Sequence, residues 1–259
     1  MTAVIVVVIV VILENAVSSP PVSGFDISYP QCGHSYPASP LFGIVGVDGG
    51  RSNVANPCLA DQMSWAHGSP GQRRPPQPRL SLYINTGNPG GDHVADWPTD
   101  GSTGPYGACN GALTNACSYI YGVQRAAYSY RLVAAHDAAA ARTAPWWLDV
   151  EILASWAGTY KLNIAALQGF LAGLRSAGAR APIGIYSTRA QWKDITGLTA
   201  ETTTAAFGRR LPDWVAGTDA TRADAFESCE SGGFTGSDPA LAQYRSGSFD
   251  ADVRCGTAR

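Results

Sequence analysis

The stretch WWLDVE at residues 146–151 begins with apolar residues and ends in two carboxylates, Asp149 and Glu151. Such a run predicts a buried β-strand, and side chains two positions apart on a strand share a face. If this strand ends at the rim of a barrel, both carboxylates face one pocket, where burial and mutual repulsion raise at least one pKa. A carboxyl group tuned in this way can act as a general acid. The simpler interpretation is that Asp-x-Glu closes the strand or caps the next helix.

The composition fits a folded domain with a neutral ligand or substrate. With 259 residues, 45% of them hydrophobic, the chain can form one barrel-sized domain or two small ones. The formal net charge is -2, and Lys161 and Lys193 are the only lysines. A nucleic-acid-binding domain carries a basic face, so we expect no nucleic-acid partner.

The N-terminus carries an unbroken apolar run at residues 3–13. This run is long enough for the core of a signal peptide and too short to span a bilayer comfortably. We expect residues 1–19 to be a signal peptide, with an uncleaved N-terminal membrane anchor as the alternative, and residues 20–259 to form the folded domain. The protein would then be secreted or held at the cell surface.

Six cysteines support export, because an even number fits disulfides formed in an oxidising compartment. Among fifteen connectivities we favour the sequential one, which pairs Cys32 with Cys58, Cys109 with Cys117, and Cys229 with Cys255. Metal binding is the competing interpretation. The chain has no Cys-x-x-Cys, and its histidines lack paired ligand spacing, so we expect neither a metal nor a cofactor.

Short apolar segments alternate with Ala-rich helical segments from residue 24 onward. Eight strands are expected, at 24–28, 44–49, 80–85, 146–151, 182–187, 213–217, 241–244 and 249–253. Helices are expected at 56–65, 118–141, 164–177 and 189–195, with Asn163 and Thr188 as N-caps. The last three strands lie too close together for full helices between them. This order favours one α/β domain, an imperfect TIM-like barrel, over a doubly wound sheet.

Polar residues gather at the ends of the expected strands, where barrels build their sites. The carboxylates among them are Asp26, Asp48, Asp149, Glu151, Asp250 and Asp252. Amide and aromatic residues accompany them, and we expect Asp48 and these residues to bind substrate: Tyr83, Asn85, Tyr186, Trp214, Gln243 and Tyr244. Two Gly/Pro-rich insertions, 68–78 and 88–108, flank the third strand and are expected to wall the cleft.

Five of these segments, in this order, resemble glycoside hydrolase family 25, the lysozyme-like muramidases. They are Gly24-Phe25-Asp26-Ile27-Ser28, Leu148-Asp149-Val150-Glu151, Gly184-Ile185-Tyr186-Ser187-Thr188, Ala242-Gln243-Tyr244 and Asp250-Ala251-Asp252. The resemblance implies a barrel of five β/α units followed by three strands. It implies Glu151 as proton donor, Asp149 as the other carboxylate of the Asp-x-Glu motif, and Asp26 as the first-strand aspartate. The last-strand aspartate is taken as Asp252, with Asp250 as the competing alignment.

Two segments depart from the family pattern. Val47-Asp48-Gly49-Gly50 stands where the family usually has a Lys-Ala-Thr-Glu-Gly-like run. The third strand and its continuation, residues 82–90, read LYINTGNPG in place of a Tyr-His-Phe type of strand. The chain therefore resembles a divergent member, similar to secreted actinobacterial barrel proteins that share the domain.

The resemblance implies cleavage of the glycan backbone of peptidoglycan after N-acetylmuramic acid. We expect a monomer that needs no cofactor. Glycoside cleavage needs one protonated carboxyl for the leaving oxygen and one ionised carboxylate for the charge at the anomeric carbon. Glu151 is expected to be the acid, and Asp149 and Asp252 are expected to stay ionised. A substrate-assisted and a covalent route both remain open. The alternative from another class is a non-catalytic barrel that binds cell-wall glycan.

Overall fold

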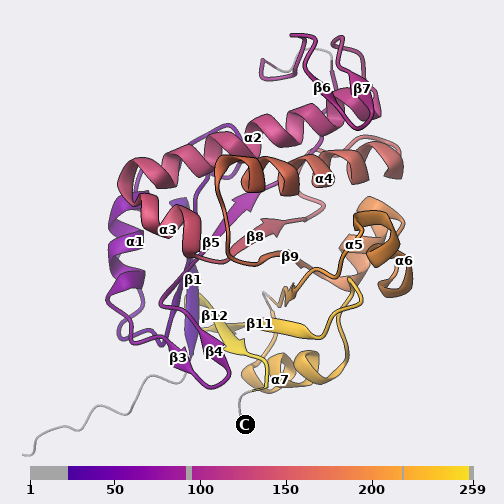
Figure 1. Cartoon of the computed structure of the whole chain (residues 1–259). Coiled ribbons are helices and arrows are strands. Elements are labelled where there is room, and N and C mark those ends of the chain that lie inside the picture. The colour runs from indigo at the N-terminus through magenta and orange to yellow at the C-terminus, as the bar shows by residue number, and fades with distance from the viewer. Residues whose placement is uncertain (1–22, 92–94, 218, 257–259) are drawn as a thin grey trace, which may run out of the picture.

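The fold is a closed barrel of eight strands, seen in a computed structural model that describes residues 23–91, 95–217 and 219–256. Figure 1 shows the barrel strands with helices packed around them. Around the barrel the strands follow the order β1-β12-β11-β10-β9-β8-β5-β2. All neighbours run parallel except β12, which is antiparallel to both β11 and β1. The expected signal peptide or anchor at residues 1–19 lies outside the described residues. Within these residues, no helix combines the length and apolarity needed to cross a bilayer.

The eight expected strands are all present, which confirms the α/β TIM-like barrel. Each expected segment contains one barrel strand, with bounds that differ by a few residues. The strands are β1 (Gly24–Ile27), β2 (Gly43–Gly46), β5 (Leu80–Asn85), β8 (Trp146–Asp149), β9 (Ile183–Ser187), β10 (Asp213–Val215), β11 (Pro239–Ser246) and β12 (Phe249–Arg254).

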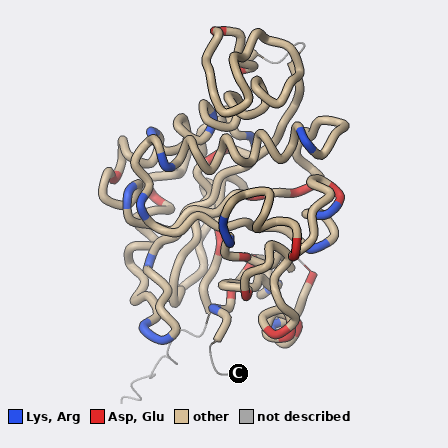
Figure 2. The backbone as a smooth tube through the Cα atoms, turned by 45° about the vertical axis from the view of Figure 1, so that its right-hand side comes forward, with Lys and Arg blue, Asp and Glu red and all other residues tan. Residues whose placement is uncertain are grey.

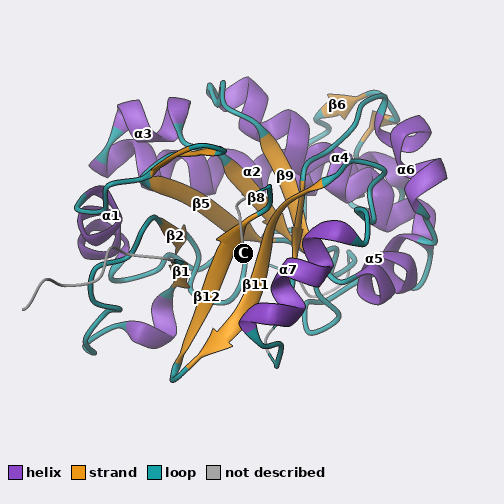
Figure 3. Cartoon of the chain, turned by 90° about the horizontal axis from the view of Figure 1, so that it is seen from below, coloured by secondary structure: helices purple, strands orange, loops and turns teal. Residues whose placement is uncertain are grey.

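Helices cover the outside of the barrel. They are α1 (Leu59–His67), α2 (Asn115–His136), α3 (Ala138–Thr143), α4 (Tyr160–Ala177), α5 (Arg189–Thr196), α6 (Ala200–Phe207) and α7 (Arg222–Glu230), with a 3-10 turn η1 (Tyr29–Gln31) after β1. The expectation that no full helix separates the last three strands is wrong, because α7 lies between β10 and β11 in the chain and packs beside β11 (Figure 3). Its apolar pattern is weak, since only Ala225 and Phe226 are buried.

Two helix boundaries differ from the expectation for a local reason. The expected helix at 118–141 is interrupted at Asp137, whose carboxylate accepts from Ala140 N at 2.8 Å and starts α3. Asn163 is not an N-cap, because α4 begins at Tyr160 and the Asn163 amide instead binds Ala157 and Ile195 backbone groups. Thr188 does cap α5, through a hydrogen bond from Gln191 N at 3.1 Å.

The core consists of two layers because successive strand residues face opposite sides. The outer layer lies between the strands and α1 to α5, and it includes Leu82, Ile84, Trp146 and Leu148. The inner layer fills the barrel with Phe42, Ile44, Trp147, Tyr186, Trp214 and Leu241. Lysine and arginine are scattered over the outside of the described chain (Figure 2). The apolar interior therefore leaves the strand ends as the place for polar chemistry.

The two insertions lie at opposite ends of the barrel. Residues 68–78 form a hairpin of β3 (Gln72–Arg73) and β4 (Pro76–Gln77) that precedes β5, so it sits at the N-terminal end of that strand. This hairpin therefore does not line a cleft at the carboxyl ends of the strands, contrary to the expectation. Residues 88–108 follow β5 and carry the hairpin of β6 (Thr103–Gly104) and β7 (Gly107–Ala108) (Figure 1). Only this second insertion is positioned to reach the carboxyl ends of the strands.

The three disulfides are the expected pairs, Cys32–Cys58, Cys109–Cys117 and Cys229–Cys255. The last one ties α7 to the residue that follows β12, across a sequence separation of 26. Replacing both Cys229 and Cys255 by alanine should lower the free energy of unfolding by about 3 kcal/mol, because the unfolded chain regains loop entropy. Urea unfolding measures this change. Repeating it with both proteins reduced isolates the effect of the replaced side chains, and equal stability of the oxidised proteins would contradict the expectation.

Candidate active site

A cavity of about 730 Å³ opens at the carboxyl ends of β2, β5 and β8. Three of the strand residues that were expected at the site line this cavity, namely Tyr83, Asn85 and Asp149. Glu151, two residues beyond Asp149, lines it as well. Apart from Tyr121 on α2, the remaining lining residues come from the segments that follow β1, β2, β5 and β8. The cavity thus occupies the end of the barrel at which such folds build their sites.

Asp149 and Glu151 face this cavity together. Asp149 ends β8 next to Asn85 of β5, and the Asn85 amide donates to its Oδ2 at 2.8 Å. Burial, and then the charge of Glu151, raise the pKa of Asp149 well above its usual value. Burial also raises the pKa of the less buried Glu151, and a hydrogen bond to the Gln191 side chain partly offsets that effect. The pair therefore retains protons at a pH where free carboxyls have lost them.

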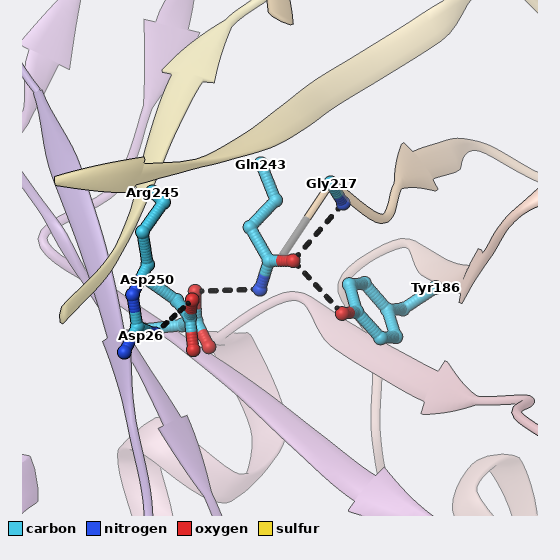
Figure 4. A network of polar contacts seen from close by, with 6 residues as sticks. All are labelled: Asp26, Tyr186, Gly217, Gln243, Arg245 and Asp250. Atoms are coloured by element: carbon cyan, nitrogen blue, oxygen red, sulfur yellow. Dashed lines mark hydrogen bonds and ion pairs between the residues drawn. The ribbon is translucent and has the colours of Figure 1, made fainter. Parts of the chain in front are cut away.

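A hydrogen-bonded chain crosses the barrel from β1 to β9 (Figure 4). The Gln243 amide donates to Asp26 Oδ2 at 3.0 Å, and its carbonyl accepts from Tyr186 OH at 2.9 Å and from Gly217 N at 3.1 Å. Two donors on the carbonyl fix the orientation of the amide, so its NH₂ group must point to Asp26. Burial and the nearby Asp250 raise the pKa of Asp26 to about 7. Asp26 is therefore poised to change charge near neutral pH.

The two aspartates of β12 occupy different depths. Asp250 pairs with Asp26 across the β1–β12 ladder and receives a hydrogen bond from Arg245 at 2.8 Å (Figure 4). Asp252 is 0% exposed, and Trp214 Nε1 donates to its Oδ1 at 2.8 Å. Burial, and then the charge of Asp26, raise the pKa of Asp252 well above its usual value.

Two carboxyls differ from the expected ionisation. Asp252 and Asp149 were expected to stay ionised, but burial beside other carboxyls favours their neutral forms. The nearby Asp252 carboxyl lowers the pKa of Asp26, whereas burial and the charge of Asp26 raise that of Asp252, so the neutral form is favoured at Asp252. Within the described part of the chain, no group of three or more His, Cys, Asp and Glu is arranged to hold a metal ion. The raised pKa values of Asp149 and Asp252 indicate that protons reduce the negative charge of this acidic group.

Aromatic rings close the barrel interior around Trp214. Its ring centroid lies 4.4 Å from that of Tyr186, 5.9 Å from that of Trp147 and 6.1 Å from that of Tyr83. Glycines on neighbouring strands leave room for these rings: a Cβ added at Gly184 would lie 2.3 Å from the Trp147 ring. Of the aromatic residues expected to bind substrate, Tyr83 lines the cavity, while Tyr186 and Trp214 are buried inside the barrel.

Asp48 and Tyr244 were expected to contact substrate, and the structure places both away from the cavity. Asp48 is 1% exposed, and its carboxyl accepts from Asn85 N at 3.0 Å and Ser129 Oγ at 2.9 Å. It supports the residue that holds Asp149. Tyr244 packs in the outer layer with Phe226 of α7 and hydrogen-bonds Ser23. Adjacent strand residues face opposite sides, so Tyr244 cannot share the interior with Gln243.

Several cavity residues lie on loops that the strand-end pattern did not single out. They include Tyr29, Arg51, Asn53 and Leu153. Arg51 is the only positively charged residue among the described residues that line the cavity. Leu153 is 93% exposed, and its position just after the Asp-x-Glu motif was the available signal. An apolar residue that follows a strand end and stays in solvent is suited to contact a ligand.

Sequence comparison connects the central part of the chain to lysozymes. The family model described as lysozyme-like protein 1 matches residues 121–214. A curated relative, probable GH family 25 lysozyme 4 of Dictyostelium discoideum, is 34% identical over 108 residues, which are 41% of this chain and 45% of that protein. The chain therefore matches less than half the length of this relative.

Solved structures share the fold over almost the whole chain. A muramidase from Trichobolus zukalii has a TM-score of 0.52 at 15% identity and covers 91% of this chain and 94% of its own. A lysozyme from Streptomyces coelicolor has a TM-score of 0.52 at 16% identity, covering 93% and 95%. The Cpl-1 endolysin complexed with a peptidoglycan analogue has a TM-score of 0.51 at 16% identity, covering 93% and 56%. The chain is thus similar in sequence to a family 25 lysozyme over part of its length, and it shares its barrel fold with muramidases and lysozymes over almost the whole chain.

Proposed function

We propose that this protein is a glycoside hydrolase that cleaves the glycan backbone of bacterial peptidoglycan, as an N-acetylmuramidase. The observation that carries the proposal is the placement of Glu151 and Asp149 on one cavity, with raised pKa values. Cleavage of a glycosidic bond needs a carboxyl that keeps its proton until the leaving oxygen takes it. A cavity of about 730 Å³ is large enough to enclose sugar residues beside that carboxyl.

Glu151 is the proposed general acid. It lies beyond the end of β8, partly open to the cavity, so a substrate can reach its carboxyl. Burial, and then the charge of Asp250, raise its pKa. A sugar that fills the cavity excludes more water and favours the neutral carboxyl further. The Gln191 side chain binds the Glu151 carboxyl and accepts from Ile152 N at 2.7 Å, which fixes the acid relative to its own loop.

Asp26 and Asp149 are the proposed partners of this acid. Since burial beside Asp26 favours the neutral form of Asp252, the negative charge of the two aspartates is assigned to Asp26. Such a carboxylate stabilises positive charge at the anomeric carbon or orients the substrate's N-acetyl amide. Asp149 has one oxygen bound by Asn85, while its buried Oδ1 has no protein partner. Because that oxygen is shielded from solvent and has no donor, the neutral form of Asp149 is favoured.

The decisive experiment is the analysis of reaction products. Purified peptidoglycan is incubated with the protein, the soluble fragments are reduced with borohydride, and their reduced ends are identified by mass spectrometry. A muramidase leaves reduced N-acetylmuramic acid at the new ends. Reduced N-acetylglucosamine would contradict the proposed linkage. If no fragments appeared while the protein still sedimented with peptidoglycan, the non-catalytic glycan-binding alternative would replace the hydrolase.

We also infer an extracytoplasmic location, where peptidoglycan is accessible. Three disulfides support an oxidising compartment. A secreted protein and one held at the cell surface by its N-terminus both satisfy this inference. We further propose that the protein acts as a monomer, because Glu151, Asp149 and Asp26, the residues proposed for catalysis, all belong to one barrel.

A further inference from the structure

A second cavity, of about 380 Å³, lies beside the candidate active site. Ala154 lines both cavities, so the short segment after Glu151 forms the ridge between them. Ile152 and Leu153, on this ridge, are large apolar residues exposed to solvent. None of the residues proposed for catalysis lines the second cavity, but Ile152, the residue directly after Glu151, does.

Tyr160 supplies a fixed aromatic surface to this cavity. It is the first residue of α4 and is 55% exposed. Its ring lies against Gly197, the left-handed C-cap of α5, where an added Cβ would come within 2.4 Å of the ring. Glycine at this position therefore lets the ring rest on the backbone. A ring supported on one side and exposed elsewhere is a ready stacking surface that loses little entropy on binding.

Trp156 and Asp194 complete a mixed apolar and polar lining. Trp156 Nε1 donates to Glu151 O at 2.8 Å, so the polar atom of the indole is already satisfied. The ring thus contributes apolar surface to the second cavity while its N–H fixes the backbone of the general acid. Asp194 on α5 is exposed and presents a carboxylate to the same cavity. Aromatic rings beside a hydrogen-bond acceptor match a sugar ring, which has apolar faces and hydroxyl donors at its edge.

We propose that the second cavity is a sugar subsite, which binds the glycan chain beyond the residues held at Glu151. This inference rests on the proposed function. The occupant is a further sugar of the same chain, because the two cavities adjoin across the ridge and a polymer can lie across both. Binding there packs against Trp156, whose hydrogen bond holds the Glu151 backbone. The subsite therefore links chain length to the placement of the general acid.

The first test compares hydrolysis of glycan fragments of increasing length. In the wild-type protein, long fragments should have a higher kcat/KM than short ones. In Tyr160→Ala the ratio of these two values should be about fivefold to tenfold smaller, because one stacking contact is lost. Tyr106→Ala is the matched control, since Tyr106 is an exposed tyrosine on the β6–β7 hairpin away from both cavities. If the ratio of kcat/KM for long fragments to that for short fragments were the same in Tyr160→Ala as in the control and the wild type, the proposed subsite would be wrong.

The second test needs no turnover, so it separates the subsite from the proposed function. Soluble glycan fragments are titrated into the Glu151→Gln protein, and the Trp156 indole resonance is followed by NMR, with Trp156→Phe providing its assignment. A shift that saturates with long fragments and weakens in Glu151→Gln/Tyr160→Ala supports the sugar subsite, even for a protein that hydrolyses nothing. No shift, or a shift with sugar-free stem peptide alone, overturns it.

Discussion

Replacing Glu151 by glutamine is expected to lower kcat/KM on peptidoglycan by about 10³-fold, the size of effect typical of a lost general acid. Glutamine keeps the shape of the side chain but has no proton to give to the leaving oxygen. For the wild-type protein, activity should fall as the pH rises through the raised pKa of Glu151, because only the neutral carboxyl can donate. Release of soluble muropeptides, measured across a range of pH, reports both effects.

Glu227→Gln is the matched control for this experiment. Glu227 is an exposed glutamate on α7, on the outer side of the barrel, and should tolerate the same change with activity within about twofold of wild type. Circular dichroism establishes that both variants are folded. A Glu151→Gln protein as active as the control would remove Glu151 from the role of proton donor.

The second large effect concerns stability and pH. Burial raises the pKa of Asp48 to about 8, whereas an unfolded aspartate releases its proton near its model value of 3.8. Between these values the folded state binds more protons than the unfolded state, so the free energy of unfolding falls as the pH rises. The contribution of Asp48 to the free energy of unfolding is fully present below the pKa of the unfolded state. It is lost as the pH rises through the pKa of the folded state. One such group accounts for a slope of about 1.4 kcal/mol per pH unit.

Asp48→Asn should reduce this slope, because the amide mimics the neutral carboxyl. Its carbonyl can accept from Asn85 N, and its NH₂ can donate to Ser129 Oγ, the two groups that Asp48 now contacts. We expect the stability difference between pH 5 and pH 8 to shrink by about 2 kcal/mol or more, as measured by urea unfolding at each pH. Asp238→Asn, at an exposed position before β11, is the control. Equal slopes for Asp48→Asn and wild type would show that Asp48 stays ionised in the folded protein.

Local sequence patterns were sufficient for the barrel strands and for the placement of Asp149 and Glu151 on one cavity. Strands such as Ile183–Ser187 are short apolar runs bounded by turn residues, and the order of strands and helices allows few topologies. The side-chain period of two places Asp149 and Glu151 on one face whatever the neighbours are. The sequence pattern did not predict helix α7, because its buried residues are too few to create a helical periodicity.

Other parts of the site depend on contacts that no local pattern contains. Gln243 binds Asp26 across 217 positions, and only the closure of the barrel brings them together. The neutral state of Asp252 follows from its complete burial beside Asp26, which depends on how deep each residue of β12 lies. Loop residues such as Arg51 and Leu153 reach the cavity through the paths of their loops, and strand-end reasoning does not describe those paths.

Because β12 runs antiparallel to its neighbours, its first residues, and not its last, lie at the opening of the barrel. On β8 the later residue, Glu151, extends past the strand end, whereas on β12 the earlier residue, Asp250, lies nearer the opening and Asp252 lies deeper. The β11–β12 turn, with Gly247 in the left-handed region at φ 62°, therefore sits at the mouth of the barrel. Residues added to this turn would reshape the entrance while both ladders of β12 keep the deep aspartate in register. The last hairpin thus allows the opening to vary independently of the buried acids.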